Sequence, residues 1–244
     1  MVYKNREEAG RILAKKLRRF KNDSVVVLAL PRGGVVLGAE VAKDLKAPLE
    51  PLIARKIGHP YFPEYAIGSV TEGQEPTFNE AEVARLDKQL IKELVATQRL
   101  EIERRKKLYF GDSRKSPDLK DKTAIIVDDG IATGYTMAAA ISALAAQGPK
   151  RIVVAVPVAP AEAVRSLSLT ADEVVVLDDP ENFRGAVGAH YLDFRQIDDG
   201  QVKKILTEVN YDLYGKTPKN KQPAVVSQKD QEFSNHWIRY RPVR

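Results

Sequence analysis

The sequence has no cysteine, and only three histidines, one tryptophan and two methionines among 244 residues. Without cysteine the chain cannot form a disulfide, use a thiol nucleophile or bind zinc through sulfur. The histidines are scattered and show no metal-ligand spacing, so any metal is expected to be a hard cation such as Mg²⁺, bound by oxygen atoms. The patterns Gly-x-x-x-x-Gly-Lys and Gly-x-Gly-x-x-Gly are both missing, which excludes two common phosphate-binding loops.

Long apolar runs are missing as well. No stretch is long enough to span a bilayer, and the first eight residues contain no apolar signal-peptide core. We therefore expect a cytoplasmic protein without a membrane partner. With 43% hydrophobic residues the chain can bury one sizeable core, and its length fits one α/β domain with an elaboration better than two equal domains.

Positive charge is concentrated at the C-terminal end. Seven basic and two acidic residues from Gly215 onward supply +5 of the net charge of +6, so residues 1–214 are nearly neutral. This segment, residues 215–244, has the Pro, Lys and Gln content of a linker, followed by Phe233, Trp237 and Tyr240 among arginines. Such residues can stack bases and neutralise phosphates of single-stranded nucleic acid. The favoured alternative for so short a segment is docking on the protein's own surface or on a second subunit.

Residues 124–144 are the most informative part of the chain. Residues 124–127 form an apolar run typical of a buried parallel strand, which ends in Asp128 and Asp129 and continues through a turn of small residues into a helical pattern. A helix N-terminus with a glycine and two threonine hydroxyls suits a phosphate dianion. The acids would repel that phosphate, so we expect them to face vicinal sugar hydroxyls or a divalent cation. Together the acid pair and the helix N-terminus predict a ribose 5-phosphate site. Its phosphate loop consists of Ala132, Thr133, Gly134, Tyr135 and Thr136.

This segment closely resembles the phosphoribosyl-pyrophosphate (PRPP) motif of the type I phosphoribosyltransferases. The resemblance implies that Asp128 and Asp129 hold the ribose hydroxyls and that the loop holds the 5-phosphate. Two positions depart from the family pattern. Gly130 stands where an aliphatic or serine residue is usual, and Ala132 stands where several 6-oxopurine enzymes carry an aspartate that serves as general base. The second departure leaves the general base and the acceptor unassigned.

A second loop, Pro31-Arg32-Gly33-Gly34, follows the apolar run at residues 25–30 and precedes a helical pattern. Two glycines after a strand free the backbone to form an anion nest, and Arg32 adds a fixed positive charge. We expect pyrophosphate here. The loop resembles the pyrophosphate loop of the same family, in which the peptide bond before the basic residue is often cis, so the resemblance implies a cis bond between Pro31 and Arg32.

The rest of the chain alternates strand and helix patterns, as a doubly wound sheet does. We predict an α/β fold with a doubly wound parallel sheet, of the type I phosphoribosyltransferase kind, for residues 1–214. A flexible-loop and helical insertion is expected at about residues 55–122 and a small hood at about residues 181–197. Further strands are predicted at residues 49–53, 152–156 and 174–177. An opening amphipathic helix carries Ala9, Ile12, Leu13, Leu17 and Phe20 on one face.

The insertion lies where the family carries a loop that closes over PRPP and excludes water. Its pattern predicts a loop at residues 58–63, a short strand near residues 67–71 and one long helix, marked by an apolar stripe from Val83 to Leu94. Arg55 and Lys56 follow a strand directly and are candidates to clamp the departing pyrophosphate. Arg104 and Arg105 are weaker candidates, because an exposed charged helix face explains them equally well.

The hood contains residues 183–195, part of which resembles the nucleobase-binding segment of hypoxanthine-guanine phosphoribosyltransferases. The resemblance implies that Phe183 stacks on a base beside Val187, and that Asp193 helps to hold Mg²⁺. This segment has one residue too many between Gly188 and the pair Leu192-Asp193. The alternative is a strand and turn that pack Tyr191 and Phe194 in the core.

These features predict a Mg²⁺-dependent phosphoribosyltransferase that moves the 5-phosphoribosyl group from PRPP to a nitrogenous acceptor, a purine-type base being one candidate. A homodimer is expected. Two other functions remain open. One is a non-catalytic regulator of the same fold that senses PRPP, and the other is a related hydrolase or phosphorylase of a ribosylated compound.

Overall fold

The computed structural model describes residues 1–63, 65–73, 75–110 and 118–214. Its centre is a five-stranded sheet in the order β2-β1-β6-β7-β8, in which every neighbouring pair is parallel. The predicted doubly wound parallel sheet is confirmed. Its strands are β1 (Val25–Ala29), β2 (Leu49–Pro51), β6 (Thr123–Val127), β7 (Arg151–Val156) and β8 (Glu173–Val176).

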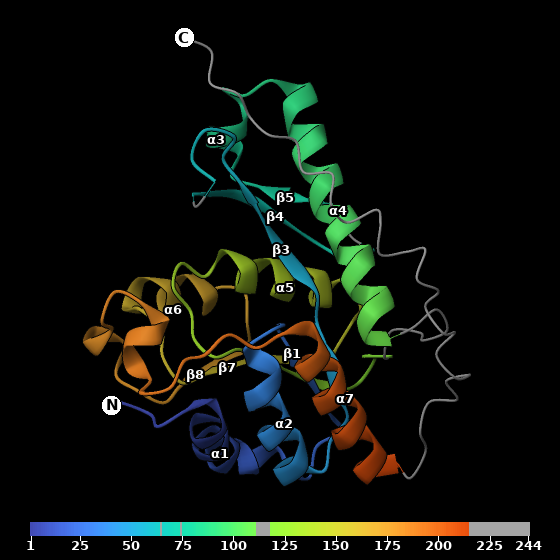
Figure 1. Cartoon of the computed structure of the whole chain (residues 1–244), viewed down its shortest axis with the longest axis vertical. Helices are drawn as coiled ribbons and strands as arrows, with labels where there is room; N and C mark the ends of the chain where they lie inside the picture. The colour runs from blue at the N-terminus through green and yellow to red at the C-terminus, as the bar shows by residue number, and fades with distance from the viewer. Residues whose placement is uncertain (64, 74, 111–117, 215–244) are drawn as a thin grey trace, which may run out of the picture.

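Helices cover both faces of this sheet (Figure 1). Alternate residues of β1 point to opposite faces: Val25 and Val27 pack with α1, α2 and α7, whereas Val26 and Leu28 pack with α5 and α6. Because both faces are covered, the strands are apolar at nearly every position, as the sequence pattern requires. The helices are α1 (Arg6–Leu17), α2 (Gly34–Leu45), α5 (Tyr135–Ala145), α6 (Ala161–Leu167) and α7 (Asp199–Tyr214).

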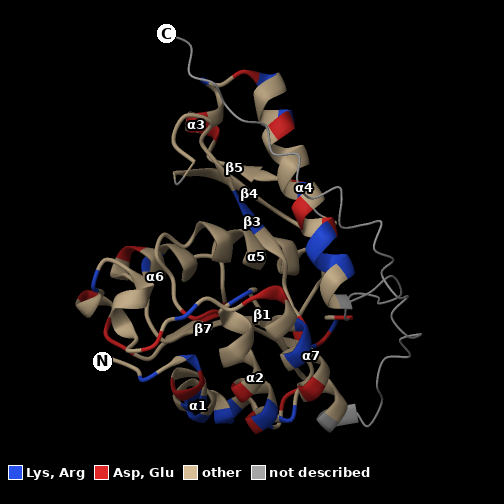
Figure 2. Ribbon diagram, viewed as in Figure 1, with Lys and Arg blue, Asp and Glu red and all other residues tan. Residues whose placement is uncertain are grey.

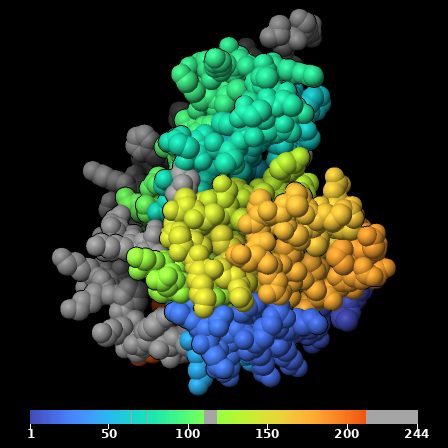
Figure 3. Space-filling view, turned by 180° about the vertical axis from the view of Figure 1, so that it is seen from behind, coloured from blue at the N-terminus to red at the C-terminus, as the bar shows by residue number. Residues whose placement is uncertain are grey.

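The insertion is a separate lobe with its own sheet, which stands on α5 (Figure 3). Its three strands are antiparallel in the order β3-β4-β5, and the described part of residues 54–110 is called the insertion lobe below. The sequence predicted one strand here, and β3 and β5 were missed. The lobe consists of β3 (Ala54–Gly58), β4 (Ala66–Thr71), β5 (Thr77–Phe78), α3 (Glu80–Val83) and α4 (Lys88–Phe110).

The predicted long helix is present as α4, but its expected extension back to Val83 was wrong, because the helical structure is broken between Val83 and Lys88. The side chain of Asp87 accepts hydrogen bonds from the backbone N–H groups of Gln89 at 2.8 Å and Leu90 at 3.0 Å. These bonds satisfy two of the free N–H groups at the start of α4, so Asp87 caps a new helix. An apolar stripe at helical spacing continued across the break and concealed it.

The two predicted ligand loops follow β1 and β6, which lie side by side. The chain leaves β1 toward β2 on one side and enters β7 from β6 on the other, so the strand order reverses between β1 and β6. Ligands of open α/β sheets bind at the carboxyl ends of strands flanking such a switch point. The remaining short helices are η1 (Arg18–Phe20), η2 (Pro180–Asn182) and η3 (Val187–His190). Within the described ranges, no helix carries an apolar stretch long enough to cross a membrane.

Candidate functional site

The acid pair Asp128 and Asp129 lies at the carboxyl end of β6, the central strand of the sheet. Asp128 Oδ1 accepts a hydrogen bond from the backbone N–H of Asp129 at 2.8 Å. Burial raises the pKa of Asp128 well above its ordinary value, and the neighbouring Asp129 charge raises it further. Burial also raises the pKa of Asp129, although the nearby Arg6 cation opposes this effect. The two carboxylates thus share a site where charge is costly.

Arg6 is a residue of this site that the sequence interpretation missed. Its Nε donates to Asp129 Oδ2 at 2.7 Å, and the whole residue is only 8% exposed. A signal for it was present: Arg6 lies on the buried stripe of α1, three and seven positions before Ala9 and Leu13. A charged residue at an apolar-stripe position requires a buried partner, which here is Asp129.

The glycine loop after β1 touches the acid pair. The peptide bond between Pro31 and Arg32 is cis, as the resemblance implied. A Cβ at Gly33 would overlap the Asp129 carboxylate, and one at Gly34 would lie 2.7 Å from the Val127 carbonyl oxygen. Both positions therefore need glycine, because only glycine allows the loop to approach the end of β6 this closely.

The predicted phosphate loop forms the turn from β6 into α5. Gly134 is the N-cap of α5 and has a left-handed backbone with φ of 82°. A Cβ at Gly130 would lie 2.5 Å from Val187 Cγ1 and 2.8 Å from Val158 Cγ2. This explains why glycine replaces the usual aliphatic or serine residue at position 130: the hood residue Val187 fills the space that a side chain would need.

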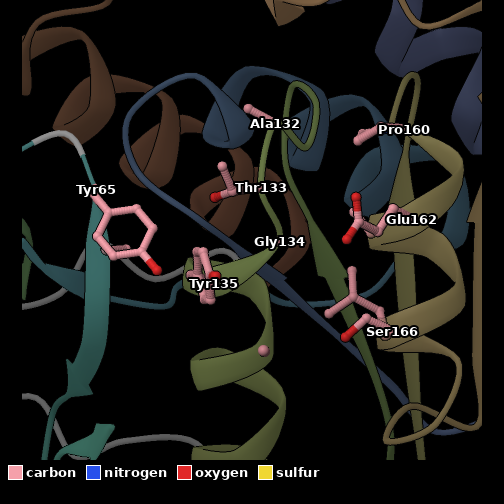
Figure 4. Close-up of a pocket in the computed structure, with 12 residues that line it drawn as sticks. Tyr65, Ala132, Thr133, Gly134, Tyr135, Pro160, Glu162 and Ser166 are labelled. Atoms are coloured by element: carbon pink, nitrogen blue, oxygen red, sulfur yellow. The ribbon is translucent and has the colours of Figure 1, made fainter. Parts of the chain in front are cut away.

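A cavity of about 400 Å³ opens beside the phosphate loop. Tyr65 of the insertion lobe lies on one side of it, Glu162 and Ser166 of α6 lie on the other, and Tyr135 stands between them (Figure 4). Glu162 is the single charged side chain among the described residues that line the cavity. The full lining consists of Tyr65, Ala66, Ala132, Thr133, Gly134, Tyr135, Ala138, Pro160, Glu162, Ala163, Ser166 and Leu167.

Comparison with known proteins decides the family. The model of the phosphoribosyl transferase domain matches residues 1–193. The chain belongs to the phosphoribosyl transferase family. The family expected from the two motifs is thus confirmed.

Two relatives from Mycobacterium tuberculosis, strains CDC 1551 and H37Rv, are each 39% identical over 214 residues, which cover 87% of this chain and 48% of theirs. Both are named only provisionally as phosphoribosyl transferases, and the chain spans about half the length of these curated relatives. The crystal structure of TT1426 from Thermus thermophilus is 41% identical, covers 85% of this chain and 99% of that chain, and superposes with a TM-score of 0.72. The fold therefore extends over nearly all of a separately solved relative.

The hood of this phosphoribosyl transferase domain contacts the acid pair directly. The Tyr191 hydroxyl donates to the Asp129 backbone carbonyl at 2.6 Å, and the Tyr191 ring stacks on Phe194 with centroids 5.0 Å apart. Phe183, predicted to stack on a base, stacks on His190 at 5.4 Å. Asp193, predicted to help with Mg²⁺, binds the Arg195 guanidinium at 2.6 Å. In this structure both predicted hood residues therefore have partners within the hood.

The predicted basic clamp lies on β3 and α4 of the same domain, where Figure 2 shows basic residues on both elements. Arg55 Nε donates to Gln98 Oε1 at 3.0 Å, and burial lowers the pKa of Arg55, as does the nearby Arg105 charge. Arg104 forms ion pairs with Glu101 at 2.7 Å and with Asp199 at 3.0 Å. Arg105 pairs with Glu101 at 2.7 Å. Lys56 follows Arg55 on β3. Arg104 and Arg105 thus have carboxylate partners within the fold.

Proposed function

We propose that this chain binds PRPP and transfers its 5-phosphoribosyl group to a nitrogenous acceptor with release of pyrophosphate, or catalyses the reverse reaction. The observation that carries the proposal is the contact between Gly33 and the Asp129 carboxylate. This contact brings the predicted pyrophosphate loop against the acid pair at the carboxyl end of β6, where the strand order of the sheet reverses. A ligand that bears pyrophosphate next to a ribose diol would contact both the loop and the acid pair.

In the proposed reaction the bond from C1 of the ribose to pyrophosphate breaks and a bond from C1 to the acceptor nitrogen forms. Asp128 and Asp129 accept hydrogen bonds from the ribose hydroxyls, and the loop from Ala132 to Thr136 holds the 5-phosphate. Arg32 with the N–H groups of Gly33 and Gly34 holds the departing pyrophosphate. The ribose becomes oxocarbenium-like, so catalysis would come from positioning and charge stabilisation, without a covalent nucleophile.

Mg²⁺ fits this site only together with the ligand. Among the described residues, no group of three or more histidine, aspartate and glutamate side chains is arranged to hold a metal ion. The acid pair offers oxygen donors, but Asp129 already pairs with Arg6 at 2.7 Å. Mg²⁺ commonly uses few protein carboxylates and completes its octahedron with phosphate oxygens and water. When bound, it would neutralise charge on the pyrophosphate, with Asp128 and Asp129 as the nearest candidate protein donors.

The proposed acceptor is a nitrogenous compound. We place it at the hood, where Phe183 and Val187 are the candidate contacts. Val187 lies against Gly130 within the PRPP motif, so a base held there would be next to the ribose.

Replacing Arg32 with alanine should weaken inhibition by pyrophosphate about tenfold or more, because a charge-assisted contact to the leaving group is lost. Binding of ribose 5-phosphate should stay within about twofold, since that ligand lacks the pyrophosphate. Arg18→Ala is the matched control, because Arg18 is an exposed arginine that pairs with Asp44. Equal losses for both ligands in Arg32→Ala would mean that the loop has misfolded.

The two alternative functions are separated from transfer by one assay. A panel of purines, pyrimidines and simple amines, tested for pyrophosphate release from PRPP, should give release with at least one acceptor. A PRPP-sensing regulator predicts PRPP binding with no release throughout. A hydrolase or phosphorylase predicts that ribosylated compounds are cleaved without PRPP.

Residues 215–244 lie outside the described residues, so their role stays a prediction. Truncation after Gly215 should leave PRPP affinity unchanged and lower the melting temperature or the dimer affinity, through lost apolar burial worth about 2 kcal/mol. A titration with single-stranded RNA and DNA at two salt concentrations provides the contrast. Tight, steeply salt-dependent binding by the full chain alone would favour the nucleic-acid-binding regulator.

A further inference from the structure

We propose that Arg6 is a positioning residue of the ribose site, which holds the Asp129 carboxylate and the hood in one shared arrangement. For its ligand this inference rests on the proposed function. For the coupling between the acid pair and the hood it rests on contacts within the chain alone.

One guanidinium joins three segments that are distant in the sequence. Arg6 lies on α1, and its Nε donates to Asp129 Oδ2 at 2.7 Å. Its Nη1 donates to the Arg195 backbone carbonyl, also at 2.7 Å. The Phe194 ring lies over the same group, with its centroid 3.9 Å from the guanidinium carbon. The planar guanidinium can make these contacts at once because its N–H groups point in fixed, different directions while its face remains free to stack. Lysine, with a compact ammonium, could keep the charge but not all three contacts.

Both the side-chain carboxylate and the backbone carbonyl of Asp129 accept hydrogen bonds. Arg6 binds its carboxylate, and the Tyr191 hydroxyl of the hood binds its backbone carbonyl at 2.6 Å. A Cβ at Gly33 would also lie 2.9 Å from Arg6 Nε, so Arg6 borders the predicted pyrophosphate loop. The Arg6 side chain therefore lies where the acid pair, the hood and the pyrophosphate loop meet.

This location has a consequence for ligand binding. Two adjacent carboxylates repel each other, and hydrogen bonds from a ribose diol require the accepting carboxylate to hold one orientation. Arg6 supplies an opposing charge beside this pair and fixes the orientation of the Asp129 carboxylate through the 2.7 Å hydrogen bond from its Nε. The titratable groups that face Asp129 are Arg6 on α1, Asp128 after β6 and Tyr191 of the hood.

The first test is PRPP binding in the presence of Mg²⁺, measured by calorimetry near pH 7.5. Arg6→Ala should weaken binding about tenfold or more, and Arg6→Lys should recover part of the loss. Arg11→Ala, an exposed arginine of the same helix, is the matched control and should bind as wild type.

A double-mutant cycle separates positioning from general stability. If Arg6 acts through Asp129, then Arg6→Ala in an Asp129→Asn background should change the affinity by less than about twofold. The same loss in both backgrounds would overturn the proposal.

Hydrogen exchange tests the hood coupling without PRPP. Arg6→Ala should speed exchange of backbone amides in residues 191–197 relative to Arg11→Ala, whereas unchanged exchange there would overturn the coupling. If the wild type fails to bind PRPP, the proposed function is wrong, and the exchange result still decides whether Arg6 positions the hood.

Discussion

Substitution of both acids, Asp128→Asn with Asp129→Asn, should weaken PRPP binding by on the order of 100-fold, or about 3 kcal/mol. The reason is that amides replace two partly buried carboxylates that would accept charge-assisted hydrogen bonds from the ribose hydroxyls. Calorimetry with PRPP and Mg²⁺ measures the loss directly. Equal affinity in wild type and double mutant would remove the ribose assignment.

The single substitution Asp128→Asn shows whether such a loss comes from unfolding. Burial and Asp129 raise the pKa of Asp128, so the charged form is disfavoured in the folded state. A raised folded pKa means that stability falls as the pH rises above the ordinary aspartate value toward the folded pKa. Asp128→Asn should remove this fall and melt at a higher temperature than wild type at pH 7, although it binds PRPP more weakly. A gain in stability with a loss of binding is expected at a functional site.

Gly34→Ala should disrupt the same site from the opposite loop. A Cβ at Gly34 would lie 2.7 Å from the Val127 carbonyl oxygen and 2.9 Å from Asp128 Cα, and backbone atoms cannot rotate away. We expect the free energy of unfolding to fall by about 1–3 kcal/mol. PRPP binding should weaken by on the order of 100-fold, because a shift of about 1 Å between the loops misplaces the groups that hold the ligand.

Gly200→Ala is the control for this prediction. Gly200 is near the start of α7, and the one atom close to a Cβ there is Asp198 Oδ1 at 3.1 Å. Alanine is the better helix former by about 1 kcal/mol, so the control should be neutral or stabilising in urea unfolding. Should Gly34→Ala behave like Gly200→Ala, the close approach of the two loops would not matter for binding.

Local patterns were sufficient to predict the parallel sheet. Residues 25–29 and 123–127 are buried at every position and almost wholly apolar, because a strand covered on both faces has no polar side. The pattern was less informative in the insertion lobe. There β3 and β5 are short and carry basic or polar residues, and an apolar stripe spans the break before α4. Short, half-exposed elements depend on tertiary contacts, which a local pattern does not record.

The positions of the two loops could be predicted because each is a continuous segment that joins a strand to a helix through glycines. Glycine at position 130 had no such explanation in the sequence. It became clear only from Val187, a hood residue far along the chain that fills the space of the missing side chain.

The sequence by itself determined the family, the doubly wound sheet and the two loops at its carboxyl edge, since these follow from contiguous motifs and from apolar periodicity. Only the tertiary structure decided which groups meet in the site. Arg6 and Asp129 are 123 positions apart, and their ion pair exists because α1 packs against α2 with its first turn beside the carboxyl end of β6. Contacts between segments so distant depend on how helices dock on the sheet. That docking is set by side-chain packing across the whole core, which no single motif contains.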